Sequence, residues 1–131
     1  MPSMPWRAFG TPQPDLEYAA LLSYLPLKSI WRVPSFMVYT VRVMRQLASA
    51  EGLVGYSLLA HPFAKKFWTL SVWQSEAALQ SFVRRAPHRN IMASLAPHML
   101  KTAFVHWTVK GSELPLQWED ALGRLSNSPL V

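Results

Sequence analysis

Cysteine is absent from this chain of 131 residues. Disulfides, thiolate metal ligands and a cysteine nucleophile are therefore excluded. Acidic residues are also few, seven against thirteen Lys and Arg, and the net charge is +6 at pH 7. Apolar residues make up 50% of the chain and charged residues only 15%, a composition that favours a folded core over disorder. We expect a cytoplasmic protein, because the lack of cysteine suits a reducing compartment.

Long hydrophobic runs are missing as well. The longest stretch without a charged residue, 52–64, has 13 residues and contains Pro62, whereas a membrane-spanning helix needs about 20. The N-terminal segment 1–14 holds four prolines and lacks the apolar core of a secretory signal. Glycine is scarce and scattered, so no phosphate-binding loop is present. These absences leave a single compact domain as the expected class.

The positive charges are dispersed along the chain. No nucleic-acid-binding motif accompanies them, and we expect no nucleic-acid partner. An excess of positive charge of this size would still steer an acidic ligand, an acidic protein or an anionic membrane surface towards the molecule. The basic residues that carry this argument are Arg42, Arg45, Lys65, Lys66, Arg84, Arg85 and Arg89.

Hydrophobic periodicity predicts the order of the elements. Apolar residues recur at helical spacing within 33–50, and Gly52 would end that helix. Over 66–73 the side chains alternate between two faces with the two-residue period of a strand. The short turn before this strand predicts an antiparallel hairpin with the preceding strand. Ser75 is placed to cap the next helix, and Pro87 breaks that helix and restarts it at His88. The predicted strands are 17–27, 53–60, 66–73 and 101–109, and the predicted helices are 33–50, 75–86, 88–96 and 114–125.

This β-α-β-β-α-β order with a closing helix predicts a ferredoxin-like α+β domain built on a four-stranded antiparallel sheet. The domain would span 16–126, between a proline-rich arm at 1–15 and a tail at 127–131. We expect the arm to be irregular and to lie over the domain or over a partner. The strands are apolar or aromatic on both faces. A sheet with one solvent-exposed face should carry polar residues on that face. A second hydrophobic layer is therefore expected, supplied by a second copy of the chain in a homodimer.

The junction between the third strand and the following helix reads FWTLSVWQSEAALQSF at 67–82, and APHR follows at 86–89. This pattern resembles the dimeric α+β barrel superfamily that includes the antibiotic-biosynthesis monooxygenases, and most of all its spheroidene monooxygenase-like branch. The resemblance covers residues 50–110 and implies a dimeric α+β barrel with oxygenase-like activity. Metal-free members of the superfamily oxidise electron-rich aromatic compounds that themselves activate oxygen. Their Trp, Asn, Tyr and Arg helpers have possible counterparts here in Trp68, Asn90, Tyr39 and Arg42.

Two histidines are candidates for catalysis. His88 would stand at a helix N-terminus, where the helix dipole disfavours a protonated ring, and a neutral imidazole can act as a base or ligate haem iron. It could equally be a packing residue beside Pro87. His106 shares a strand face with Phe104, and its ring would line a cavity if that face meets the helices, or an interface if it meets a partner. His61 and His98 suit turn and helix-end positions.

Aromatic residues are abundant, and such a set usually fills core and interface. The alternative is a flat apolar pocket for an aromatic or polyene ligand. The candidate substrate-binding residues are Trp68, Trp73, Trp107, Tyr24, Arg42 and Phe104.

Other chemistry finds no support in the sequence. The carboxylates form no acid/base pair, no nucleophile elbow is present, and the histidine spacing predicts no zinc site. Three functions stay open: an oxygenase-like enzyme acting on an apolar small molecule without a cofactor or with haem on His88, a cofactor-free isomerase, cyclase or dehydratase, and a ligand-binding protein without catalysis.

Overall fold

The structure is a computed structural model that describes residues 6–9, 11–85 and 88–126, without the side chains of residues 88, 89 and 126. The predicted tail 127–131 lies outside the described residues. The main helices are α1 (Val33–Leu47), α2 (Glu76–Arg84), α3 (His88–Leu95) and α4 (Trp118–Ser126), and the strands are β1 (Arg7–Ala8), β2 (Glu17–Pro26), β3 (Leu53–His61), β4 (Lys66–Trp73) and β5 (Ala103–Lys110). Short 3-10 turns are η1 (Ile30–Arg32), η2 (Pro62–Ala64), η3 (Ala96–His98) and η4 (Gly111–Glu113).

The strands form one antiparallel sheet in the order β1-β3-β4-β2-β5. The four long strands have the predicted ferredoxin-like order, and the predicted β3–β4 hairpin is confirmed. The prediction of an irregular arm was wrong at Arg7–Ala8, because this segment pairs with β3 as a fifth strand. Gly55 permits this approach, since a Cβ atom at that position would collide with the ring of Trp6.

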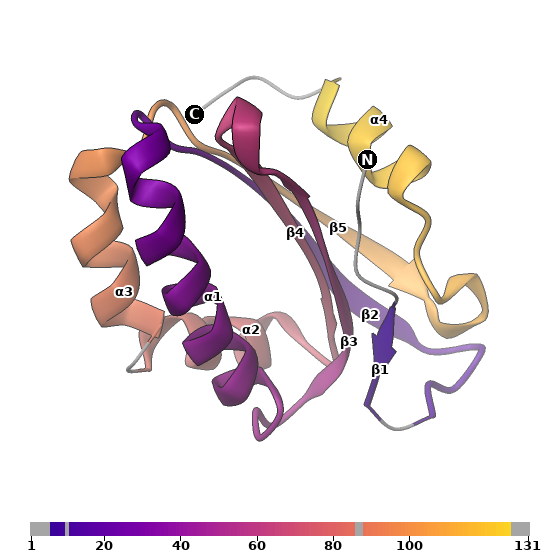
Figure 1. Cartoon of the computed structure of the whole chain (residues 1–131). Helices are drawn as coiled ribbons and strands as arrows, with labels where there is room; N and C mark the ends of the chain where they lie inside the picture. The colour runs from indigo at the N-terminus through magenta and orange to yellow at the C-terminus, as the bar shows by residue number, and fades with distance from the viewer. Residues whose placement is uncertain (1–5, 10, 86–87, 127–131) are drawn as a thin grey trace.

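Three helices, α1, α2 and α3, cover one face of the sheet (Figure 1). The Ser75 cap acts as the sequence predicted, whereas α1 ends at Leu47, three residues before the predicted end at residue 50. The Ser75 hydroxyl accepts a hydrogen bond from the amide of Ala78 at 3.1 Å and so caps α2. Gly52 has a φ of +82°, a value that favours glycine, in the turn between α1 and β3. Buried Leu, Phe and Trp side chains between these helices and the sheet form the larger part of the core.

The opposite face of the sheet is covered by α4 and the segment that leads into it. Ala121 of α4 is 1% exposed and packs on Leu22 and Leu70, which are both fully buried. The helix was predicted from residue 114 but begins at Trp118. Leu114 has extended backbone, with φ −89° and ψ 148°, as expected before a proline. Leu114 and Leu116 then pack on the outer face of the sheet before the helix begins.

The packing of α4 on the sheet corrects the inference that a second copy of the chain must cover the outer face. Two apolar sheet faces do require two apolar layers, but the chain supplies the second layer itself through Trp6, Leu116 and α4. An apolar outer sheet face therefore does not by itself demand a second copy of the chain. The homodimer stays a prediction.

Candidate functional site

A cavity of about 360 Å³ lies between the sheet and the three helices α1, α2 and α3. Among the residues whose side chains are described, its roof consists of apolar side chains from α1, α2 and α3, and Tyr39, Thr40 and Gln80 add polar groups there. Its floor consists of side chains from β2, β3, β4 and β5. Most lining side chains are apolar, as is typical of a site for an apolar small molecule.

Strand register sets the floor of the cavity. Leu21 of β2 pairs with Ser71 of β4 on one side and with His106 of β5 on the other. These three residues therefore form a row across the sheet, and all three line the cavity. Antiparallel partners point to the same face of a sheet, so the row carries a hydroxyl and an imidazole towards the helices. The next row repeats the arrangement with Thr69, Ser23 and Phe104.

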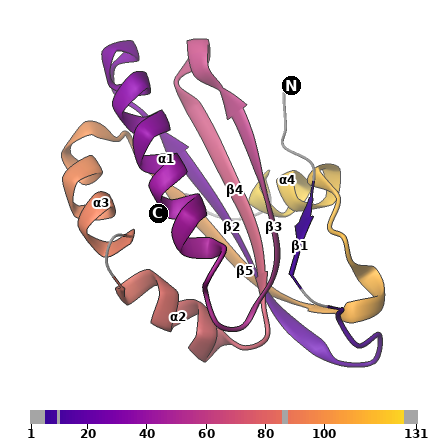
Figure 2. The ribbon, with the colours of Figure 1, turned by 60° about the horizontal axis from the view of Figure 1, so that its bottom comes forward.

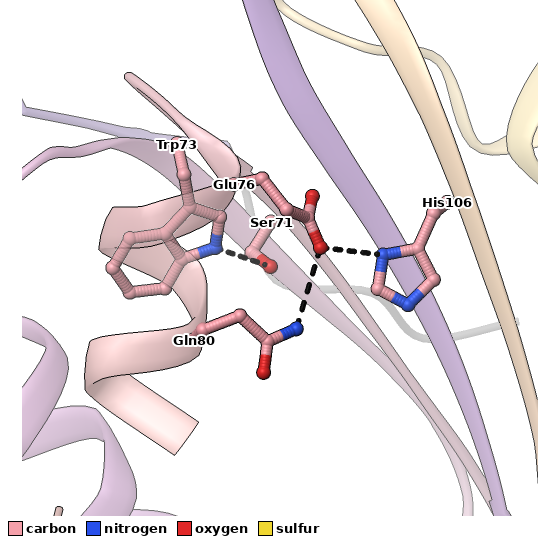
Figure 3. A network of polar contacts seen from close by, with 5 residues as sticks. All are labelled: Ser71, Trp73, Glu76, Gln80 and His106. Carbon is pink, nitrogen blue, oxygen red and sulfur yellow. Dashed lines mark hydrogen bonds and ion pairs between the residues drawn. The ribbon is translucent and has the colours of Figure 1, made fainter. Parts of the chain in front are cut away.

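Polar side chains from β4, α2 and β5 gather beside one another (Figure 3), and all of them except Glu76 line the cavity. The indole Nε1 of Trp73 donates a hydrogen bond to the Ser71 hydroxyl at 3.0 Å. Oε1 of Glu76 lies 3.5 Å from Nδ1 of His106 and accepts a hydrogen bond from Nε2 of Gln80 at 3.3 Å. The Glu76 carboxylate thus connects the first turn of α2 to β5.

His106 lines the cavity and is partly exposed, whereas its partner Glu76 lies outside the cavity lining. The side chains of His106 and Glu76 are 46% and 56% exposed, and the neighbouring Phe104 is 41% exposed. Both members of the pair line a shallow groove on the outside of the molecule. An ion pair this exposed contributes at most about 1 kcal/mol to stability. Its value is orientation, because a proton on Nδ1 facing the carboxylate leaves Nε2 as the acceptor nitrogen.

Four of the residues singled out in the sequence line the cavity: Tyr39, Trp73, Phe104 and His106. The sequence did not decide whether the strand face that carries His106 meets the helices or a partner. In the structure this face is covered by α1, α2 and α3. Trp73 is 1% exposed and forms part of the core as well as the cavity wall.

Three other predicted residues, Trp68, Trp107 and Tyr24, lie on the opposite face of the sheet. Trp68 stacks on Tyr24 with ring centroids 5.4 Å apart. The guanidinium carbon of Arg124 lies 4.9 Å from the centroid of the Trp107 ring. None of the three is among the residues that line the cavity.

Two further candidates stand outside the cavity lining, and one side chain is not described. Arg42 is exposed on α1, with its guanidinium 5.9 Å from the centroid of the Tyr39 ring. Asn90 is exposed on α3. The backbone of His88 begins α3 as predicted, but its side chain lies outside the described residues, and its proposed role stays a prediction.

Sequence reasoning missed the partners that surround His106. A carboxylate at position 76 suits the first turn of a helix on dipole grounds alone, and nothing in the sequence singles out Gln80. The two-residue period of β4 places Ser71 and Trp73 on the same face of the sheet. Nothing local connects residue 76 to residue 106, because that contact depends on the pairing of β2 with both β4 and β5.

The described lining does not fit a haem well. Among the described lining residues, His106 is the one imidazole, and no Lys or Arg occurs to pair with the haem carboxylates. The predicted haem ligand His88 has no described side chain, so that role stays a prediction. No cluster of three or more metal-ligating His, Asp or Glu side chains occurs among the described residues. No helix in the described part of the chain has the length and apolar character to span a membrane.

Comparison with known proteins finds similarity in structure rather than in sequence. No family model matches the chain, and no curated protein sequence matches it. SnoaB, a cofactor-independent oxygenase from Streptomyces nogalater, matches with a TM-score of 0.59 at 14% identity, over 77% of this chain and 100% of SnoaB. A conserved protein from Methanosarcina mazei Go1 matches with a TM-score of 0.62 at 15% identity, over 69% and 90% of the two chains.

A putative antibiotic biosynthesis monooxygenase from Nitrosomonas europaea matches with a TM-score of 0.60 at 14% identity, over 68% of this chain and 95% of that protein. Identities this low establish the fold and leave the chemistry open. The chain therefore has the ferredoxin-like α+β fold seen in antibiotic-biosynthesis monooxygenase structures.

Proposed function

We propose that the protein is a small-molecule oxygenase that binds an electron-rich aromatic substrate in the cavity between the sheet and α1, α2 and α3. The single observation that carries this proposal is the apolar cavity with a carboxylate-oriented imidazole in its lining. The fold shared with SnoaB, a cofactor-independent oxygenase, supports it. A closer relation to the spheroidene monooxygenase-like branch and a cytoplasmic location remain part of the proposal.

The residues have distinct roles in this reaction. The aromatic and aliphatic walls bind the rings of the substrate and exclude water. Nε2 of His106 takes the proton of a substrate phenol, and Glu76 stabilises the imidazolium that forms. Gln80 holds the carboxylate in place through its 3.3 Å hydrogen bond. The hydroxyl of Ser71, fixed by the Trp73 indole, is placed to donate to a substrate oxygen.

Dioxygen is the oxidant, and the phenolate itself supplies the electrons. One ring C–H and the phenol O–H are replaced by the two carbonyl groups of a quinone. One atom of O₂ enters the product and the other leaves as water. Four electrons pass from the substrate to O₂, so the step needs no external reductant.

The test uses 1-naphthol and 1,5-dihydroxynaphthalene as probes, with oxygen uptake and quinone absorbance as readouts. Loss of a positioned general base costs typically 10²–10⁴-fold in rate. We therefore expect His106→Asn to lower kcat by about 100-fold or more while the affinity for the probe changes little. His61→Asn is the matched control, because His61 packs edge-on against Trp68 and does not line the cavity. Equal rates for the two variants would refute the role of His106.

The His106–Glu76 pair also favours a second candidate, a cofactor-free proton-transfer enzyme such as an isomerase, cyclase or dehydratase. Such an enzyme would use the same pair without consuming oxygen. Turnover of a substrate under argon, abolished in His106→Asn, would favour this reading over the oxygenase. Saturable binding of the naphthols without turnover in air or under argon would leave a ligand-binding protein as the better description.

A further inference from the structure

One end of the molecule combines protruding apolar side chains with a ring of positive charge. We propose that this end, here called the tip, docks on an anionic lipid bilayer. Its apolar members are Ile30, Trp31, Phe63 and Leu100, and its basic members are Lys28, Arg32, Lys65, Lys66 and Lys101. This surface is separate from the cavity, and the proposal does not depend on the proposed oxygenase activity.

Two aromatic side chains project from the tip almost completely into solvent. Trp31 is 85% exposed on η1, and Phe63 is 94% exposed on η2. Ile30 and Leu100 beside them are 40% and 55% exposed. A monomeric protein has little reason to hold aromatic residues at the ends of convex turns, and such patches usually mark an interaction site. Tryptophan in particular is enriched at the membrane–water interface.

Backbone hydrogen bonds join the segments of the tip into one surface. The amide of Leu27 donates to the carbonyl of Lys65 at 2.8 Å, which ties the end of β2 to the β3–β4 turn. The amide of Lys28 donates to the carbonyl of His98 at 2.9 Å. The amide of Leu100 donates to the carbonyl of Pro26 at 2.9 Å. Figure 2 shows the start of α1 and the β3–β4 turn at the same end of the molecule.

Most of the acidic residues lie at the other end of the sheet from the tip. The five basic residues of the tip flank the end of β2, the β3–β4 turn and the start of β5, and no acidic residue occurs within 18–50, 52–75 or 77–112. Because neighbouring strands are antiparallel, the start of β2, the start of β3, the end of β4 and the end of β5 meet at the other end. Five of the seven acidic residues lie next to those strand ends: Asp15, Glu17, Glu51, Glu76 and Glu113.

This arrangement suits a lipid surface better than a second copy of the chain. Two tips brought together would place ten basic side chains and no acidic ones against each other, and their repulsion opposes such a dimer. An anionic bilayer offers negative headgroups for the Lys and Arg residues and an apolar layer for Trp31 and Phe63 at the same time. The exposed Val38 and Val41 extend the apolar surface from the tip along α1.

The experiment measures binding of the full chain to vesicles of phosphatidylcholine, with and without 30% phosphatidylglycerol, by flotation. We expect binding to the anionic vesicles only. Trp31→Ala/Phe63→Ala should lower the partition coefficient at least tenfold, because burial of two large apolar groups is lost. Lys28→Gln/Arg32→Gln should lower it about thirtyfold, at about fivefold for each basic residue near the surface.

Matched controls come from the other end of the sheet. Leu16→Ala removes an exposed apolar side chain there, and Lys110→Gln/Arg84→Gln lowers the net charge from +6 to +4, as the tip variant does. Both controls should bind as the parent chain does. Tryptophan emission should shift to the blue on vesicle binding, and this shift should be smaller in Trp31→Phe.

Three results would overturn the proposal. One is equal binding by Trp31→Ala/Phe63→Ala and the parent chain. Another is equal weakening by the tip and control charge variants, which would indicate a general charge effect. The third is absence of vesicle binding together with self-association, or capture of an acidic protein, that Trp31→Ala/Phe63→Ala abolishes.

Discussion

The packing of α4 on the outer face of the sheet can be tested by placing a charge under it. Ala121 is 1% exposed and rests on Leu22 and Leu70. In Ala121→Glu the new carboxylate would have to be buried without a partner, which costs far more than the helix can recover. We expect α4 to lift away from the sheet and the rest of the domain to stay folded on the α1, α2 and α3 side.

The expected loss of stability follows from what α4 covers. Full burial of a Leu side chain contributes about 1.5–3 kcal/mol. We take about half of that value for each of Leu22 and Leu70, because other residues of the cluster still cover them when α4 leaves. The half-buried Trp118 loses a similar contribution, and its Nε1 hydrogen bond to the Ser57 hydroxyl, 3.1 Å long, is worth about 1 kcal/mol. The total is about 4 kcal/mol, which corresponds to a fall in Tm of about 15 °C for a domain of this size.

Thermal unfolding followed by circular dichroism measures this fall, and light scattering follows the oligomeric state. The control is Gly123→Glu, which adds the same side chain to the same helix at a site where a Cβ atom meets nothing within 4 Å. It should raise stability by a few tenths to 1 kcal/mol, because glycine is a poor helix former. An unchanged Tm in Ala121→Glu would refute the reasoning and would favour a second copy of the chain as the cover of this face.

Two further substitutions test individual contacts by thermal unfolding. Trp118→Phe should destabilise by about 1 kcal/mol more than Trp107→Phe, since Trp118 donates to Ser57, whereas Nε1 of Trp107 is buried with no hydrogen-bond partner within the described structure; equal losses would contradict this. Ser75→Ala should cost about 1 kcal/mol because the amide of Ala78 loses its acceptor, and Ser75→Thr should restore most of it; an undiminished Tm in Ser75→Ala would show that the cap contributes nothing.

Prediction of the fold from the sequence succeeded where local signals are strong. The alternation from Lys66 to Trp73 defined β4 with its observed bounds, and Ser75 capped α2 as expected. It failed where a segment owes its structure to distant residues. Arg7–Ala8 becomes a strand only because β3 offers an edge, and α4 starts late where Leu114 and Leu116 pack on the outer face of the sheet.

The candidate site was predicted in its parts but not as an arrangement. His106, Trp73, Phe104 and Tyr39 were named from residue type and strand face, and they do line one cavity. Other aromatic residues on predicted strands, such as Trp68, lie on the opposite face of the sheet. Residue type alone could not separate the two sets, because both faces of the sheet are apolar.

The sequence by itself determined the order of the elements and the faces of the strands, since period-two and helical spacing, capping residues and proline act over a few residues. Only the tertiary structure decided which layer covers each face, and that Glu76 meets His106. Those outcomes depend on strand order and register, which bring together residues thirty positions apart. A local pattern carries no information about such pairings, because many registers bury the same apolar residues, and the free energy of the whole packed domain selects among them.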